Sequence, residues 1–237
     1  IGISFVAIFI LIIAQIIAQV IASVFVIIKI PYGICNIIAG IIYAGLTHLI
    51  LKMFISKIVK LPVSDFGMPK FEIKIRWILI AILLPCIIKG IYVLIFNGEY
   101  VSSNMNGNEI FNTLSAGVAF TGIAAGFVEE MVFRGVILNA LKKRWNMKVA
   151  VIVPSMLFGI VHVLGQDFSI CSCLLVIIAG TMVGVMFSMI AIESGSVWNS
   201  GIVHAIWNVV IIGGGLAIGE KMDKYSIMTY VLNSKDF

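Results

Sequence analysis

Long apolar stretches alternate with short polar segments along most of the chain. Apolar runs of about 18 residues or more predict membrane-spanning helices. A transmembrane β-barrel would instead alternate apolar and polar positions along each strand. The pattern therefore predicts an all-α, polytopic membrane protein of about seven transmembrane helices in one bundle, a single domain over residues 1–237. The seven stretches run approximately over residues 3–28, 32–54, 77–96, 111–138, 149–164, 173–192 and 197–218.

Composition agrees with this class, because the chain is 61% hydrophobic and only 11% charged. A soluble domain carries about a quarter charged residues. The net charge of +5 is explained by basic loops at the membrane surface rather than by a nucleic-acid-binding face. We therefore expect the lipid bilayer as a partner and no nucleic acid. The first stretch is longer than the apolar part of a signal peptide, so we expect it to remain as a span.

The distribution of basic residues predicts the orientation of the spans. Lys and Arg gather between the second and third stretches and again just after the fourth, whereas the loop 97–112 carries neither. The positive-inside rule places both basic clusters in the cytoplasm and that loop outside. With seven spans, the N-terminus then lies inside and the C-terminus outside. The segment 220–237 is too polar to span, so we expect a tail that is mobile or lies on the surface.

Two adjacent glutamates, Glu129 and Glu130, lie within the fourth stretch and are followed by Arg134. Ionisable residues inside a span are costly, so they mark a candidate functional site. Glu130 and Arg134 are four residues apart and can pair on a helix, whereas Glu129 is rotated by about 100° from Glu130. We interpret Glu130 and Arg134 as structural support and Glu129 as the group available for chemistry. The alternative, that both glutamates only hold helices together, stays open. Gly122 and Gly126 predict close approach of another helix nearby.

Two further apolar stretches each carry a pair of candidate residues four positions apart, and each pair includes a histidine. Phe158 precedes His162 by four residues and is expected to pack beneath its imidazole, and His204 precedes Asn208 by the same interval. Counted from the nearest cytoplasmic turn, Glu129 and these polar residues lie at similar depths of about 16–22 Å. A lone histidine in such a helix is more often a core residue. Together, however, a glutamate, two histidines and a carboxamide can activate water and stabilise a tetrahedral intermediate.

These residues form three motifs in a fixed order. Residues 129–134 (EEMVFR) read EExxxR, residues 158–162 (FGIVH) read FxxxH, and residues 204–208 (HAIWN) read HxxxN. In that order and spacing the chain resembles the Abi/CPBP family, which comprises type II CAAX prenyl endopeptidases and bacteriocin-processing or self-immunity relatives. The resemblance covers residues 111–213, an expected catalytic core. The segment 65–68 (DFGM) is also similar to a short Asp-x-Gly element found before the third span in this family.

The resemblance implies an all-helical intramembrane endopeptidase and a role for each motif. Glu129 with His162 would activate the attacking water, and His204 with Asn208 would stabilise the oxyanion. Glu130 and Arg134 would maintain the helix arrangement. The resemblance leaves metal dependence open in both directions: no cofactor is certain, and Glu129, His162 and His204 form a donor set acceptable to Zn²⁺. The HExxH zinc motif is absent from the sequence.

The sequence therefore predicts a glutamate-dependent, CAAX-type peptidase that hydrolyses a membrane-associated peptide or protein. A CAAX tail, a bacteriocin or pheromone precursor and an anchored signalling protein all remain open as substrates. We expect a multi-pass protein of a bacterial plasma membrane, with its site opening toward the cytoplasm. Two alternatives stay open: a non-catalytic immunity or scaffold protein that binds a peptide toxin or partner, and a small proton-coupled transporter.

Overall fold

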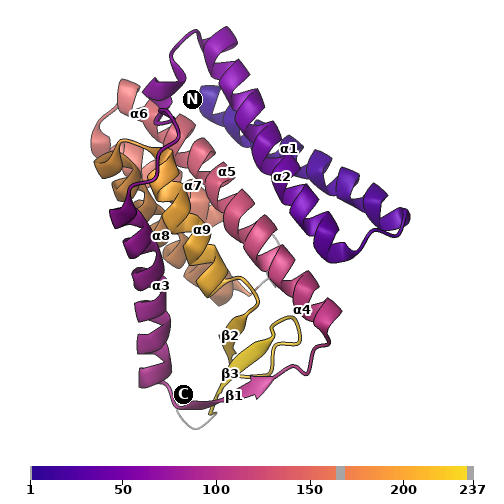
Figure 1. The fold of residues 1–237 in the computed structure, drawn as a ribbon. Helices are drawn as coiled ribbons and strands as arrows, with labels where there is room; N and C mark the ends of the chain where they lie inside the picture. The colour runs from indigo at the N-terminus through magenta and orange to yellow at the C-terminus, as the bar shows by residue number, and fades with distance from the viewer. Residues whose placement is uncertain (1, 164–168, 234–237) are drawn as a thin grey trace. The chain divides into compact units, whose positions relative to one another are not determined.

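The computed structural model describes residues 2–163 and 169–233, and helices make up most of them (Figure 1). This confirms the predicted all-α class. The α-helices are α1 (Gly2–Ile27), α2 (Tyr32–Met53), α3 (Ile75–Ile95), α4 (Gly107–Leu114), α5 (Ala125–Glu129), α6 (Leu138–Arg144), α7 (Met147–Val161), α8 (Ile170–Ser194) and α9 (Val197–Ile211). The chain also forms a short 3₁₀ turn, η2 (Val63–Phe66), and the π-helical stretches η1 (Phe54–Val59), η3 (Ser115–Ala124) and η4 (Glu130–Ile137).

Seven apolar helical segments correspond to the seven predicted stretches, but they differ in length. Five are long and apolar enough to cross a membrane: Gly2–Ile27, Tyr32–Val59, Ile75–Ile95, Gly107–Arg144 and Ile170–Ser194. The other two, α7 and α9, have 15 residues each, or about 22 Å at helical rise. The hydrocarbon core of a bilayer is about 30 Å thick. Among the described residues, five of the seven segments therefore meet the length of a complete span.

The helix in the last predicted stretch, 197–218, is shorter than the hydropathy indicated. α9 stops at Ile211, and the chain then runs through Gly213, Gly214 and Gly215. Gly214 adopts a φ of 73°, which glycine tolerates better than any residue with a Cβ atom. The glycines stop the helix although the apolar character continues beyond them, so the hydropathy pattern alone overestimated its length.

Part of the polar segment after residue 220 is ordered in a sheet, so the expectation of a mobile or surface-lying tail is wrong for residues 228–232. β3 (Met228–Leu232) is the central strand, antiparallel to β1 (Gly98–Ser102) and parallel to β2 (Leu216–Gly219) (Figure 1). The strand contains Thr, Tyr and Val, which favour β structure. The charged residues before it masked this short pattern in the sequence.

The helix Gly107–Arg144, which carries the glutamates, has a well-defined beginning. Asn106 caps it, because its side chain accepts hydrogen bonds from the backbone N–H groups of Asn108 and Glu109 at 3.0 and 3.1 Å. The Glu109 carboxylate in turn accepts from the Asn106 N–H at 2.8 Å. This reciprocal capping box satisfies N–H groups that a helix start otherwise leaves without partners.

The chain folds into two compact units. The first unit comprises residues 1–13, 47–73 and 128–201, and the second comprises residues 14–46, 74–127 and 202–237. The EExxxR and FxxxH motifs, with Glu129 and His162, belong to the first unit. The HxxxN motif, with His204 and Asn208, belongs to the second. The single domain over residues 1–237 stays a prediction.

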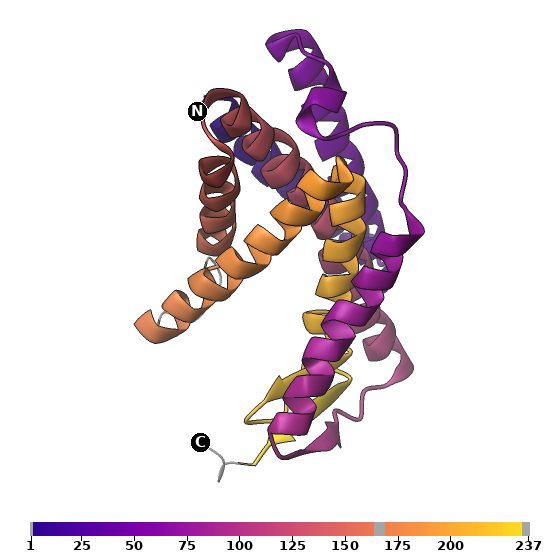
Figure 2. The same cartoon turned by 90° about the vertical axis from the view of Figure 1, so that its left-hand side faces the viewer.

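In the first unit, α7 packs against α8, and in Figure 2 the two helices are the brown-red and the orange one. A Cβ atom on Gly159 would lie 2.5 Å from the Ile177 carbonyl oxygen, and one on Gly180 would lie 2.8 Å from the Gly159 Cα. A Cβ atom on Gly184 would lie 2.9 Å from the Cα of Ser155. Small residues spaced by four on both helices thus let the backbones approach closely, as is common between membrane helices.

In the second unit, Gly122 and Gly126 provide the close approach that the sequence predicted. A Cβ atom on Gly126 would lie 2.8 Å from the Ala205 Cα, and one on Gly122 would lie 2.5 Å from a Val209 methyl group. Ala205 and Val209 directly follow the histidine and the asparagine of the HxxxN motif. The two glycines therefore allow the HxxxN segment of α9 to lie directly against the helix Gly107–Arg144.

Candidate active site

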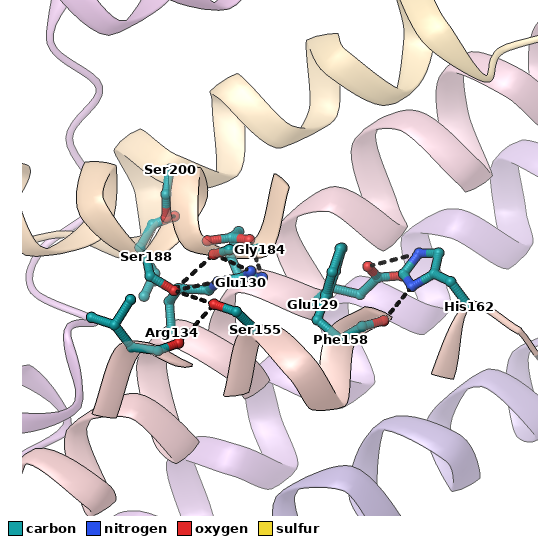
Figure 3. Close-up of polar contacts among 11 residues, drawn as sticks. Glu129, Glu130, Arg134, Ser155, Phe158, His162, Gly184, Ser188 and Ser200 are labelled. Carbon is teal, nitrogen blue, oxygen red and sulfur yellow. Dashed lines mark hydrogen bonds and ion pairs between the residues drawn. The ribbon is translucent and has the colours of Figure 1, made fainter. Parts of the chain in front are cut away.

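Glu129 and Glu130 lie where α5 passes into the π-helical stretch η4. π-Helical turns are rare and frequently occur at functional sites. The two carboxylates point to different partners: Glu130 to Arg134, and Glu129 to His162 (Figure 3). The sequence prediction that the adjacent glutamates have different neighbours agrees with this geometry.

Glu130 and Arg134 form an ion pair that water does not reach. Glu130 Oε1 accepts a hydrogen bond from Arg134 Nη1 at 2.8 Å, and both side chains are 0% exposed. A buried charge is tolerated only when it is paired and hydrogen-bonded. The pair therefore fixes this turn of η4 and has no access to a substrate.

Two further donors of Arg134 are used by α8. Arg134 Nη2 donates to the Gly184 carbonyl oxygen at 2.8 Å, and Nε donates to Ser188 Oγ at 3.4 Å (Figure 3). Ser188 Oγ itself donates to the Gly184 carbonyl at 2.8 Å and lies 3.4 Å from Ser155 Oγ. One guanidinium thus connects η4 to α8, and Ser155 adds α7 to the same network.

Three aromatic rings enclose the same guanidinium. Its Cζ atom lies 4.6 Å from the ring centre of Phe158, 5.5 Å from that of Phe187 and 5.8 Å from that of Phe133. Cations within about 6 Å of an aromatic face are attracted to it, more strongly when desolvated. Arg134 is therefore held by charge, hydrogen bonds and ring contacts together.

Sequence reasoning missed the partners of Arg134 on α7 and α8. Ser155 and Ser188 have no triad pattern around them in the sequence, and nothing else marks them as functional. The available signal is the spacing: Gly180, Gly184 and Ser188 recur every four residues in an otherwise apolar helix. Such spacing predicts a helix contact, although it does not name the arginine that the contact surrounds.

We expect Gly184→Ala to lower the free energy of unfolding by about 1–3 kcal/mol, the usual cost of overpacking. The new Cβ atom would lie 2.9 Å from Ser155 and 3.2 Å from Arg134 Nη2, so either α7 or the guanidinium must shift. Gly45→Ala on α2 is the matched control, because a Cβ atom there meets nothing within 4 Å. Unfolding in detergent, followed by circular dichroism, measures both. Equal stability of the two variants would contradict the predicted crowding.

Phe158 also contacts the histidine of its own motif. The ring centres of Phe158 and His162 are 4.4 Å apart, as their spacing of four residues predicted. His162 Nδ1 lies 2.7 Å from the Phe158 carbonyl oxygen. Because a carbonyl only accepts, Nδ1 carries the hydrogen, and Nε2 of a neutral His162 is then left as an acceptor. Phe158 therefore orients the imidazole through both its ring and its backbone.

Glu129 and His162 come together from different helices, and both side chains are partly exposed, although the Glu129 Oε2 atom that faces His162 is buried. His162 Nε2 lies 4.0 Å from Glu129 Oε2, and the side chains are 37% and 19% exposed, respectively (Figure 3). This separation is too long for a direct hydrogen bond. The side chains of this pair are thus partly open to the surroundings, in contrast to the fully buried Glu130–Arg134 pair.

His204 and Asn208 lie on α9, in the second unit. Asn208 Nδ2 donates to the Thr121 carbonyl oxygen at 3.0 Å, so one donor of the amide is engaged by the helix Gly107–Arg144. Both side chains are buried, at 1% and 5% exposure. The carboxamide orientation is therefore fixed within its own unit.

The DFGM segment ties three parts of the first unit together. Gly67 has a φ of 68°, and its carbonyl oxygen accepts from the Val197 N–H at 2.8 Å. The carbonyl oxygen of Pro69, just after the segment, accepts from Trp198 Nε1 at 2.8 Å. Asp65 pairs with Lys143 at 3.2 Å on the surface. The segment thus anchors the start of α9 and the end of α6. It contributes no residue to the Glu129–His162 pair.

The donor set for a metal is incomplete within the first unit. Glu129 and His162 provide two possible ligands, and no group of three His, Cys, Asp or Glu side chains gathers among the residues described there. Catalytic zinc usually takes three protein ligands. The first unit alone does not fit a zinc site, so we derive no catalytic step through a metal.

Comparison with known proteins agrees with the motif assignment. Residues 111–210 match the family described as Type II CAAX prenyl endopeptidase Rce1-like. None of the curated proteins and none of the solved structures compared with the chain matches it. The matched segment contains all three motifs, from Glu129 to Asn208, and the helices around it are apolar enough for a bilayer. The chain is therefore an integral membrane protein whose segment 111–210 matches the type II CAAX prenyl endopeptidases, which confirms the resemblance to the Abi/CPBP family.

Proposed function

We propose that the protein is an intramembrane endopeptidase that hydrolyses one peptide bond of a membrane-associated peptide or protein. The observation that carries this proposal is the contrast between two neighbouring pairs. Glu130 and Arg134 are sealed from solvent, whereas Glu129 and His162 face each other across 4.0 Å and remain partly exposed. The family match supports an intramembrane protease independently of this geometry.

In the proposed mechanism, Glu129 is the general base. It takes a proton from the water held between its carboxylate and His162 Nε2, and the water oxygen then attacks the carbonyl carbon of the scissile bond. The same proton passes to the amide nitrogen as the carbon–nitrogen bond breaks, which restores the carboxylate. A general base positioned in this way contributes about 10²–10⁴-fold to the rate. His162 orients the water because its Nε2 can accept a hydrogen bond, since Nδ1 donates to the Phe158 carbonyl oxygen.

His204 and Asn208 are the proposed stabilisers of the oxyanion. This role comes from the HxxxN motif and from the ability of both side chains to donate hydrogen bonds. The contact of Asn208 with the Thr121 carbonyl supports it, because a donor fixed in advance requires no reorganisation during the reaction. The proposed positioning residues, which hold η4 and the imidazole of His162, are Glu130, Arg134 and Phe158.

The proposed setting is a bacterial plasma membrane with the site opening toward the cytoplasm. The basic residues Lys142, Lys143 and Arg144 at the end of α6 support this orientation under the positive-inside rule. Glu129 precedes them by a few turns of the same helix. A substrate with an apolar anchor and a polar cytoplasmic segment would therefore present its peptide bond near the depth of the site.

The test is cleavage of a library of membrane-anchored peptides by purified protein, with new termini identified by mass spectrometry. We expect one bond to be cut close to the anchor, and a cut that persists in a chelator would assign water activation to Glu129 and His162 without a metal. Loss of cleavage in the chelator, restored by Zn²⁺, would instead assign Glu129 and His162 as metal ligands. Absence of cleavage by folded protein across the library would favour a binding or immunity role.

A further inference from the structure

A single lysine, Lys89, lies in the apolar helix α3. It stands six residues before the end of this helix at Ile95, or about 9 Å along the axis at helical rise. Its ammonium donates hydrogen bonds to the carbonyl oxygens of Val210 and Leu216. Val210 belongs to the last turn of α9, whose carbonyls have no partners within the helix, and Leu216 begins β2. Lys89 thus joins α3, α9 and β2 within the second unit.

Within the described part of the chain, these contacts leave the charge of Lys89 without a counter-ion. Carbonyl oxygens are neutral acceptors, and no carboxylate among residues 2–163 and 169–233 forms an ion pair with Lys89. An ammonium has three N–H donors, of which the two carbonyls take two. A cation inside a membrane span usually pairs with a partner. Among the described residues, one donor and one unit of positive charge of Lys89 therefore remain for an anionic group.

An apolar groove adjoins this ammonium. Its volume is about 420 Å³, and besides Lys89 its lining includes Cys86, Gly90, Val93, Leu94 and Tyr100. The two residues whose carbonyls contact the ammonium complete the lining, and among the described residues Lys89 is the only charged one in it. A groove of this composition fits a hydrocarbon chain, and its one charge selects an anionic group at the end of that chain.

The surroundings of the groove match the depth of lipid headgroups. Tyr92 packs on Phe96 with ring centres 4.5 Å apart, and Tyr100 packs on Tyr230 at 4.9 Å. Aromatic side chains gather where a membrane meets water. Leu94, which lines the groove, is 86% exposed, so this end of α3 presents apolar surface rather than a protein contact.

We propose that this groove, the Lys89 groove, binds one anionic phospholipid. The phosphate accepts a hydrogen bond from the third N–H of Lys89 and neutralises its charge, and one acyl chain lies along Gly90, Val93 and Leu94. The bound lipid would then reinforce the junction of α3, α9 and β2. This inference does not depend on the proposed peptidase activity.

Native mass spectrometry of the purified protein tests the proposal. The probes are palmitoyl-oleoyl phosphatidylglycerol and palmitoyl-oleoyl phosphatidylcholine, which share acyl chains and differ in net charge. We expect one molecule of phosphatidylglycerol to bind about tenfold more tightly than phosphatidylcholine, or about 1.4 kcal/mol. Equal binding of the two lipids would overturn the proposal. Displacement of phosphatidylglycerol by an equal concentration of oleate would assign the groove to a carboxylate and would also overturn it.

Two variants separate lipid binding from folding. Lys89→Met should bind both lipids equally, but it also removes the contacts to Val210 and Leu216. Gly90→Leu keeps those contacts and fills the groove, because a Cβ atom at Gly90 meets nothing within 4 Å. We expect it to weaken phosphatidylglycerol binding about tenfold. Gly45→Leu, at an equally open helical position on α2, should bind like wild type; a Gly90→Leu variant that also binds like wild type would refute the site.

Discussion

Glu129→Gln is expected to reduce peptide cleavage by about 10²–10⁴-fold, the contribution of a well-placed general base. The amide keeps the size of the side chain but accepts a water proton poorly at neutral pH. Because the amide has the same shape as the carboxylate and the Glu129 side chain is 19% exposed, the change should leave the fold intact. The measurement is the initial rate of cleavage at saturating peptide, with folding verified by the unfolding midpoint in detergent.

Two controls make this result specific. Glu99→Gln removes a carboxylate on the exposed part of β1 and should cleave at the wild-type rate. His162→Ala removes the second contact of the proposed water. The double variant Glu129→Gln, His162→Ala should lose little more activity than Glu129→Gln alone, because both residues act on one water molecule. A folded Glu129→Gln protein that retains wild-type turnover would remove Glu129 from the mechanism.

Arg134→Met is expected to lower the free energy of unfolding by about 3–5 kcal/mol, the cost of removing one partner of a buried ion pair. The change removes the guanidinium that pairs with Glu130 at 2.8 Å, together with the donors to Gly184 and Ser188. Cleavage should fall as well, because Phe158 loses the cation on which it packs and His162 lies against Phe158. Urea or thermal unfolding in mixed micelles provides the stability measurement.

The surface pair Lys143–Asp65 offers a matched comparison. Its side chains are 43% and 41% exposed, and exposed pairs contribute only about 0–1 kcal/mol. Lys143→Met should therefore be nearly neutral. The double variant Glu130→Leu, Arg134→Met should recover part of the stability that Arg134→Met loses, because neither charge of the buried pair is left. It should still cleave poorly, since the support for Phe158 is absent. An Arg134→Met variant as stable as Lys143→Met would contradict a structural role for the buried pair.

Much of the site geometry along a single helix could be predicted from the sequence. The pairing of Glu130 with Arg134 and the stacking of Phe158 on His162 both follow from a spacing of four residues, which places side chains on one helix face. The close approach of a second helix at Gly122 follows from the small size of glycine. These features depend on neighbours in the chain, so the local pattern is sufficient to identify them.

Contacts between distant segments could not be predicted in the same way. Arg134 reaches Ser188 across 54 positions of sequence, and no local pattern indicates which residue of α8 will face it. β1 pairs with β3 across more than half of the chain, with Gly98 opposite Leu232. The three glycines after Ile211 ended α9 early although the hydropathy continued. In each case the deciding interaction is a packing or backbone constraint that hydropathy does not record.

The sequence by itself determined the membrane class, the apolar helices and the three motifs, because hydrophobicity and helical spacing are properties of neighbouring residues. Only the tertiary structure decided which glutamate is buried and which is accessible. Glu129 and Glu130 are chemically identical and adjacent, so their difference arises from the surroundings. α8 supplies hydrogen-bond acceptors and the Phe187 ring around Arg134, and α7 brings His162 to within 4.0 Å of Glu129. Burial and long-range proximity are set by the packing of helices, and that packing separates a structural carboxylate from one that can act on water.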